Sequence, residues 1–165
     1  MNTTIAFRPY THADREACLE LFDENCPEFF APNERDDYAN FLDAEPEGYE
    51  ACIVGDRIAG AFGLIAGNAR RMHLNWILLD PKFQGLGIGS AIMGRITTLA
   101  MAAGIHVVDI AASHKSASFF AKFGAVATAT THDGWGPGMH RVDMELRAGK
   151  PDASFEPAPI RDRHD

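Results

Sequence analysis

Three glycines occur at alternate positions, Gly85, Gly87 and Gly89, immediately before a long amphipathic segment. Because glycine has no Cβ, a ligand can approach the backbone of such a loop closely. The first turn of the helix that follows would present N–H groups without intrahelical acceptors, together with the positive end of the helix dipole. This combination favours an anion, and it predicts a phosphate or pyrophosphate site.

Two common phosphate-binding loops do not fit this segment. The dinucleotide fingerprint requires G-x-G-x-x-G and an acidic residue about 20 positions later, whereas here Gly85-Leu86-Gly87 is followed by Gly89. The nucleoside-triphosphate loop requires a Gly-Lys-Ser/Thr ending, which the chain lacks. The pattern that does fit is Gln/Arg-x-x-Gly-x-Gly/Ala, through Gln84, Gly87 and Gly89.

With this motif the sequence resembles the GNAT superfamily of acetyl-CoA-dependent N-acetyltransferases. Residues 76–93 (WILLDPKFQGLGIGSAIM) are similar along their whole length to that family's cofactor-binding segment, and residues 118–125 (SFFAKFGA) are similar to a later helix. The resemblance covers most of residues 3–147, and it implies an α/β fold with a mixed, mostly antiparallel central sheet flanked by helices. It also implies acetyl-CoA as the acyl donor, a primary amine as the acceptor, and direct transfer between them.

The resemblance assigns cofactor contacts to individual positions. The main chain around Leu79 is expected to pair with the pantetheine arm as another strand would. The pyrophosphate is expected on the N–H groups of consecutive loop residues: Gln84, Gly85, Leu86, Gly87, Ile88, Gly89 and Ser90. Two positions depart from the family pattern, because Ser113 replaces an asparagine that contacts pantetheine and Phe120 replaces a tyrosine that protonates the departing thiolate. Phenylalanine has no proton to give.

Acetylation of an amine also needs groups that move protons. His73 and Asn75 lie two positions apart on an expected strand, so their side chains point to the same side. His73 is a candidate base, and Asn75 is a candidate holder of a relaying water. His114, at the start of the later helix, is the candidate replacement for the missing tyrosine. The alternatives are a surface or hydrogen-bonded structural role for His73 and a solvent-exposed helix-end role for His114.

Residues 132–140 (HDGWGPGMH) form a second region of interest, rich in glycine and aromatic side chains. Trp135 could border the acceptor site and pack on the substrate, or it could cover the sheet edge from a wide turn. His132 and His140 match no recognised metal-ligand pattern, so no metal is expected. Asp109 interrupts an apolar strand and is expected to be a structural hydrogen-bond acceptor.

Periodicity and turn residues predict the elements that position these groups. Strands are expected at residues 5–8, 49–54, 57–66, 73–79, 105–112, 125–131 and 139–147. Helices are expected from a cap at Thr11 to about Asn25, from Asn33 to before Pro46, from Ile88 to Gly104, and from a serine cap at 113 or 116 to Gly124. Residues 1–147 are expected to form a single domain, followed by a flexible tail at 148–165 that loses this periodicity.

Composition limits the class of protein. The chain has 165 residues, 46% of them apolar, which is sufficient for a packed core. The start has no signal-peptide pattern and no apolar run reaches the length of a membrane span. The three cysteines lack metal-ligand spacing. We therefore expect a cytoplasmic protein with reduced thiols and no membrane association. The net charge of −8 argues against nucleic acid as a partner.

The expected partner is a small-molecule or peptide amine, and a homodimer is compatible with the resemblance. Glu24, Glu28 and Glu34 could line a pocket for a cationic substrate, but we expect them to form a solvated acidic face instead. Two other functions remain open at this level. The chain could use a different acyl-CoA, or it could be a non-catalytic CoA-binding sensor or interaction module that lost the proton donor at Phe120.

Overall fold

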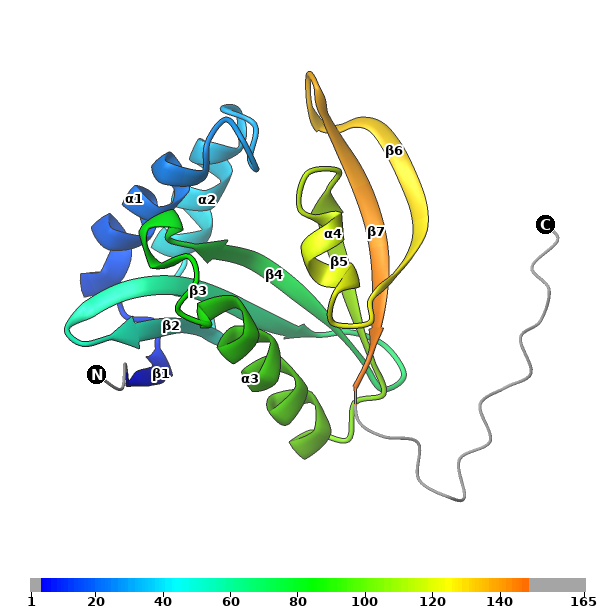
Figure 1. Cartoon of the computed structure of the whole chain (residues 1–165), viewed down its shortest axis with the longest axis horizontal. Coiled ribbons are helices and arrows are strands. Elements are labelled where there is room, and N and C mark those ends of the chain that lie inside the picture. The colour runs from blue at the N-terminus through cyan, green and yellow to red at the C-terminus, as the bar shows by residue number, and fades with distance from the viewer. Residues whose placement is uncertain (1–3, 149–165) are drawn as a thin grey trace, which may run out of the picture.

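The computed structural model describes residues 4–148 (Figure 1), so all of the expected tail except Ala148 lies outside the described residues. The strands are β1 (Ile5–Pro9), β2 (Tyr49–Val54), β3 (Arg57–Ala66), β4 (Arg71–Leu79), β5 (Val107–Ser113), β6 (Val126–Gly136) and β7 (Met139–Arg147). The α-helices are α1 (Arg15–Asn25), α2 (Glu34–Asp43), α3 (Ile88–Ala102) and α4 (Ala117–Ala121), and the 3₁₀ turns are η1 (His12–Asp14) and η2 (Pro81–Phe83).

The strands form a seven-stranded sheet in the order β1-β2-β3-β4-β5-β7-β6. The neighbours β4 and β5 run parallel, and the other neighbouring pairs run antiparallel. The parallel pair arises because α3 carries the chain from the end of β4 back to the start of β5. The expected mixed, mostly antiparallel sheet flanked by helices is confirmed.

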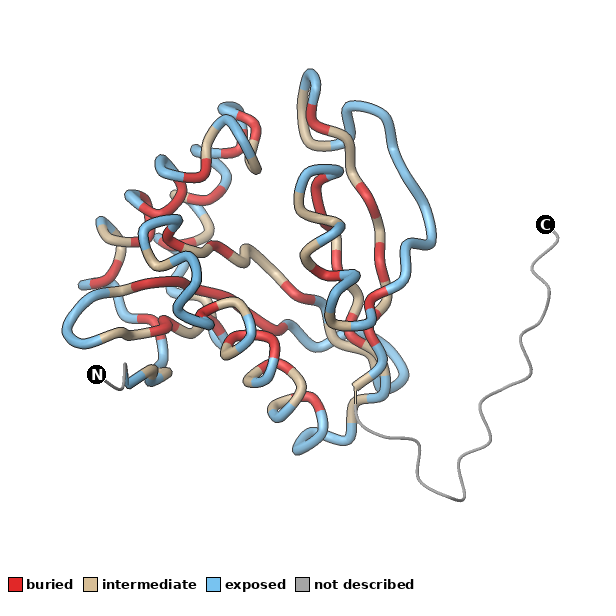
Figure 2. Tube along the Cα trace, in the orientation of Figure 1, coloured by how far each residue is buried: buried red, intermediate tan, exposed pale blue. Residues whose placement is uncertain are grey.

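Helices cover both faces of the sheet. On one face, α1 and α2 bury aromatic and aliphatic side chains, including Phe22 and Tyr38, against β2, β3 and β4. On the other face, Ile92 and Ile96 of α3 and Phe120 of α4 pack against side chains of β3, β4, β5 and β7. Figure 2 shows this buried core as red segments through the central strands, whereas β6 at the sheet edge is exposed over most of its length.

Most of the element boundaries agree with the sequence prediction. The two-residue turn between Val54 and Arg57 and the stop of α3 before Gly104, which has φ 69°, are confirmed. Two strands extend at least two residues beyond the expected bounds, since β4 begins at Arg71 and β6 continues to Gly136. None of the helices in residues 4–148 combines the length and apolar character needed to cross a membrane.

Candidate functional site

The strands β4 and β5 separate before either of them ends. They pair only between 71–74 and 107–110, although β4 continues to Leu79 and β5 to Ser113. Figure 1 shows the two strands side by side at one end and apart at the other. Main-chain edges without a neighbouring strand can pair with an extended ligand. The separated segments therefore form a candidate binding gap in the centre of the sheet.

A β-bulge bends β4 at this gap. Ala61 opposes Leu78 and Gly63 opposes Asn75, so β4 has an extra residue, and Trp76 adopts φ 43°. A positive φ is unfavourable for a large side chain and persists only where the surroundings impose it. The Tyr49 hydroxyl donates a hydrogen bond of 2.6 Å to the Trp76 carbonyl oxygen. Burial holds the pKa of Tyr49 well above its usual range, so this hydroxyl remains a donor.

After the bulge, the main chain of Leu79 faces the gap. The N–H of Asp80 donates to the Ala59 carbonyl at 2.8 Å, so Ala59 and Asp80 are a hydrogen-bonded pair of β3 and its extension. The preceding pair, Gly60 and Leu79, is therefore a non-hydrogen-bonded pair, and Leu79 directs its N–H and C=O away from β3.

Asn25 at the end of α1 holds this peptide in place. Its side-chain amide donates to the Leu79 carbonyl at 2.8 Å and to the Leu21 carbonyl at 2.7 Å, and the residue is buried. Within residues 4–148 the Leu79 N–H has no protein acceptor. Sequence reasoning missed Asn25 because the contact joins positions 54 residues apart.

The glycine loop presents free main-chain amides at the start of α3. The N–H groups of Gln84 and Leu86 donate to Pro81 and Phe83 within the loop, at 3.1 and 3.2 Å. For the other expected amides, no protein acceptor exists within residues 4–148; they are Gly85, Gly87, Ile88, Gly89 and Ser90. These donors lie at the positive end of a 15-residue helix, which favours a bound anion.

The glycines of this loop meet two different requirements. Gly85 and Gly87 have φ of 86° and 78°, and a Cβ on either would meet no atom within 4 Å. Their absent side chains leave open space beside the free amides. A Cβ on Gly89, by contrast, would lie 2.7 Å from the Phe119 ring. Gly89 therefore allows α3 to begin in close contact with α4.

The strand β5 ends in a turn in which Ser113 is hydrogen-bonded to Ser116. The Ser113 and Ser116 hydroxyls lie 3.0 Å apart, and the Ser116 N–H donates to Ser113 Oγ at 3.1 Å. Phe120 is buried in the core beneath α3. Neither Ser113 nor Phe120 offers an acidic proton to the gap.

The predicted proton-transfer residues occupy different positions. His73 lies in the paired part of β4, with its Nδ1 3.9 Å from Asp109 Oδ2, and its side chain is 56% exposed. Asn75 directly precedes the bulge. His114 Nδ1 accepts a hydrogen bond of 3.1 Å from the His140 N–H, so a neutral His114 carries its proton on Nε2. Their catalytic roles stay predictions.

Asp109 is a structural acceptor, as expected. Arg71 donates to both of its carboxylate oxygens at 2.9 and 2.6 Å and also to Glu145 at 2.9 Å. The guanidinium of Arg71 holds the pKa of Asp109 below its usual range. This contact ties β4, β5 and β7 together at the closed end of the gap.

The expected solvated acidic face does not hold for Glu34. Its side chain folds back to accept the Ala31 N–H at 2.8 Å, and it is buried. Burial raises the pKa of Glu34 to about 7. The correction follows from the tight turn that precedes α2, where Glu34 N–H donates to the Ala31 carbonyl at 2.9 Å.

Trp135 joins the two sides of the gap. Its indole N–H donates to the Ala112 carbonyl of β5 at 2.9 Å, and its own carbonyl accepts from the Asn33 side chain at 3.0 Å. Arg141 lies over its ring, 5.1 Å from the centroid. These contacts occupy the indole N–H and one ring face, and its proposed contact with a substrate stays a prediction.

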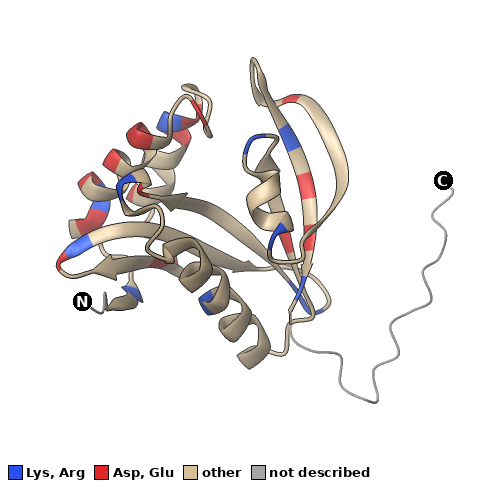
Figure 3. Cartoon of the chain, in the orientation of Figure 1, with Lys and Arg blue, Asp and Glu red and all other residues tan. Residues whose placement is uncertain are grey.

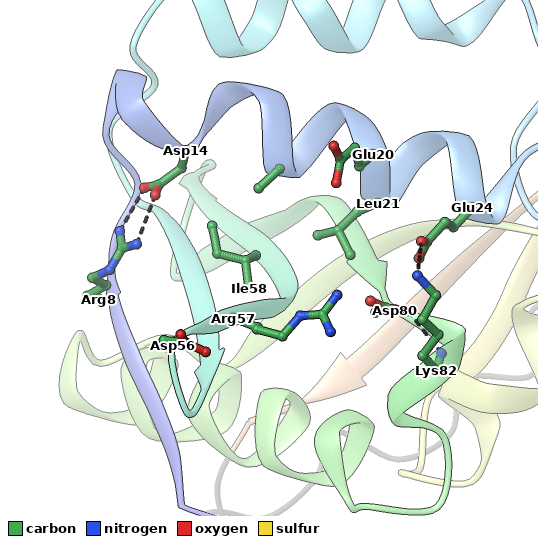
Figure 4. Close-up of a pocket in the computed structure, with 11 residues that line it drawn as sticks. Arg8, Asp14, Glu20, Leu21, Glu24, Asp56, Arg57, Ile58, Asp80 and Lys82 are labelled. Carbon is green, nitrogen blue, oxygen red and sulfur yellow. Dashed lines mark hydrogen bonds and ion pairs between the residues drawn. The ribbon is translucent and has the colours of Figure 1, made fainter.

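A separate polar cavity of about 320 Å³ lies between α1, the β2–β3 turn and η2 (Figure 4). Lys82 and Glu24 form an ion pair of 2.8 Å at one end, and Arg8 and Asp14 form one of 2.7 Å at the other. The free amides of the glycine loop do not line this cavity. It is therefore distinct from the gap.

Comparison with known proteins agrees with this geometry. Residues 16–125 match the Acetyltransferase (GNAT) family. No curated protein matches the chain. Among solved structures, Ard1 from Thermoplasma volcanium is similar at 17% identity and TM-score 0.73, over 88% of this chain and 99% of that chain.

Two further structures have the same fold. The ribosomal-protein-S18-alanine N-acetyltransferase from Escherichia coli is 12% identical with a TM-score of 0.72, over 93% of this chain and 99% of that chain. The protein yncA from Salmonella typhimurium, solved with its cofactor acetyl-CoA, is 16% identical with a TM-score of 0.67, over 92% of this chain and 99% of that chain.

Proposed function

The chain belongs to the GNAT acetyltransferase family, and we propose that it moves an acetyl group from acetyl-CoA directly to a primary amine. The observation that carries this proposal is the set of amides on Gly85 and residues 87–90, which have no protein acceptor within residues 4–148 and lie at the start of α3, with open space beside Gly85 and Gly87. The diphosphate of acetyl-CoA is a ligand of matching charge. The acetyl-CoA in the yncA structure supports the same donor here.

From this anchor, the pantetheine arm would enter the gap between β4 and β5. The free N–H of Leu79 is available to an amide of the arm or to the thioester oxygen. A main-chain N–H aimed at that oxygen would stabilise the negative charge of the tetrahedral intermediate. Asn25 keeps the Leu79 peptide in the orientation that this contact requires.

The reaction needs two proton movements. The amine nitrogen attacks the thioester carbonyl carbon, a C–N bond forms and the C–S bond breaks. A water held by Asn75 would accept the amine proton, since Asn75 borders the bulge whereas His73 lies in the paired part of β4. His114 Nε2–H would donate a hydrogen bond to the departing thiolate, in place of the tyrosine that Phe120 replaces, and water would supply the proton of the thiol.

The cysteines favour direct transfer without an acyl-enzyme. A nucleophilic cysteine normally has a lowered pKa. Here burial raises the pKa of Cys18 and of Cys52 to about 11, and it also raises the pKa of Cys26. Serine replacement of any one of them should leave turnover intact.

The charge on α1 and α2 favours a cationic acceptor. Each helix carries four acidic residues and one arginine, and Figure 3 shows these acids gathered on one side of the molecule. Such a field would attract the ammonium form of a small-molecule or peptide amine.

Calorimetric titration with acetyl-CoA tests the anchor. Gly87→Glu would place a carboxylate beside the free amides, and we expect affinity to fall by at least about a hundredfold, or about 2.7 kcal/mol. Gly94→Glu is the matched control, because Gly94 is exposed on α3 with open space around it. Equal affinity of the two variants would reject the anchor. Binding without thiol release across a panel of amines would instead favour a CoA-binding sensor.

A further inference from the structure

The β6–β7 hairpin brings together three side chains that can bind a metal. His132 and Asp133 lie on β6 and His140 on β7, and one ligand atom of each lies within 4.8 Å of the others. The regular pairing of β6 with β7 is interrupted after Thr131 and Arg141, and just beyond that point the His132 and His140 ring centroids lie 4.5 Å apart. A sequence spacing of eight residues does not reveal this, because only the register of the hairpin makes them neighbours.

Two of the distances between donors approach those of a tetrahedral site, each to a different oxygen of Asp133. Since the three ligand atoms lie within 4.8 Å of one another, they would draw together around an ion. His132 Nε2 lies 3.4 Å from Asp133 Oδ2, and His140 Nδ1 lies 3.6 Å from Asp133 Oδ1. Ligands at the Zn–N and Zn–O distances of a tetrahedral site are separated by about 3.3 Å. The donor set of two imidazoles and one carboxylate is one that Zn²⁺ and related divalent transition metals accept.

The hairpin keeps these donors near one another without a metal. Asp133 has φ 53°, and its Oδ1 accepts the Gly138 N–H at 2.9 Å. The His132 and His140 rings stack with centroids 4.5 Å apart. The Asp133 N–H donates to His140 Nδ1 at 3.0 Å. This hydrogen bond keeps the proton of neutral His140 on Nε2 and leaves the Nδ1 lone pair directed at Asp133.

We propose that His132 Nε2, the Asp133 carboxylate and His140 Nδ1 bind a divalent transition-metal ion of the Zn²⁺ type. The ion takes the Nδ1 lone pair in place of the hydrogen bond from the Asp133 N–H, so the Asp133 main chain moves aside on binding while His140 keeps its tautomer. Water completes the coordination, as it does in other zinc sites with three protein ligands. Protons compete for the imidazole nitrogens, so affinity falls as the pH is lowered.

Titration of the metal-stripped full chain with Co²⁺ tests the site, because tetrahedral Co²⁺ has a visible ligand-field absorption. We expect one equivalent to bind and added Zn²⁺ to displace it. His132→Ala and Asp133→Asn should each weaken binding more than about tenfold. Asparagine tolerates the positive φ of Asp133 and can still accept the Gly138 N–H, so Asp133→Asn keeps the hairpin intact.

His12→Ala is the matched control, since His12 is exposed on η1 away from the hairpin, and it should bind Co²⁺ as the unchanged chain does. The proposal is overturned by an absent ligand-field spectrum. It is equally overturned if His132→Ala and Asp133→Asn bind like His12→Ala, or if a thiolate-to-cobalt charge-transfer band shows ligation by cysteine.

Discussion

Glu34 is a buried carboxyl whose protonation should affect stability near neutral pH. Its pKa is about 7 in the folded protein against an ordinary value of 4.5. The folded state therefore holds this proton more tightly than the unfolded state does. The contribution of Glu34 to the free energy of unfolding should be greatest below pH 4.5 and should be lost as the pH rises through about 7.

Replacement by glutamine tests this dependence, because glutamine can still accept the Ala31 N–H. The quantity to measure is the free energy of unfolding of Glu34→Gln minus that of the unchanged chain. This difference should be about 1–3 kcal/mol more favourable to the variant at pH 8 than at pH 5. Urea denaturation at both pH values measures this quantity. A difference that is the same at pH 5 and pH 8 would mean that Glu34 titrates normally.

Asn25 should be a stabilising residue because its amide satisfies two carbonyls. Asn25→Ala removes both hydrogen bonds and should lower the free energy of unfolding by about 1–3 kcal/mol. Asn40→Ala, at an exposed position of α2, should change it by less than about 0.5 kcal/mol. Equal losses in the two variants would show that the contact with Leu79 contributes nothing.

The residues whose roles sequence reasoning found differ in kind from those whose contacts it missed. The glycine loop is a local pattern, in which glycine types and their distance from a helix start carry the information. Asn25 and Glu34 owe their roles to contacts made after folding, with Leu79 from a distant strand and with a turn that buries a carboxylate. Nothing in the neighbouring sequence distinguishes them from exposed polar residues.

At the scale of elements, the bulge in β4 depends on a buried pair of tyrosines. The hydroxyls of Tyr38 and Tyr49 lie 2.8 Å apart, and Tyr49 donates to the Trp76 carbonyl. Tyr49→Phe removes that donor and leaves the part-buried Trp76 carbonyl without it, so it should cost about 1–3 kcal/mol of stability. It should also weaken acetyl-CoA binding, because the bulge sets the direction of Leu79.

Tyr10→Phe is the matched control, since the Tyr10 hydroxyl makes a longer bond of 3.3 Å to the Leu42 carbonyl. Denaturation and calorimetric titration of the two variants compare their effects. If Tyr49→Phe costs no more than Tyr10→Phe and binds acetyl-CoA normally, the bulge does not depend on this hydrogen bond.

Strand and helix positions could be predicted because they follow periodicity, but the irregularities could not. The hairpin at Gly55 and the apolar stripe of α3 carry local signals. The bulge at Trp76 arises from the register between β3 and β4, and β6 runs past Thr131 because β7 pairs with it as far as Gly136. Both depend on a partner strand, which a single-sequence pattern does not specify.

At the scale of the whole molecule, the sheet consists of two halves, β1 to β4 and β5 to β7, which are paired only at one end of the gap. Arg71 ties β4 to β5 and β7 at the closed end, and Asn33 contacts Trp135 across the open end. A cofactor that spans both halves would connect them along the gap as well. Its binding should therefore be visible as protection of particular amides.

Hydrogen exchange with and without acetyl-CoA measures this protection. Exchange should slow at Leu79, at Gly85 and across residues 87–90, where amides are free of protein acceptors. At a free concentration one hundred times the Kd, stability should rise by about 2.7 kcal/mol. Amides of β1 and the β2–β3 turn, beside the separate polar cavity, should show only the general slowing that follows from higher stability. Specific protection there, with unchanged exchange in the glycine loop, would place the cofactor in that cavity instead of the gap.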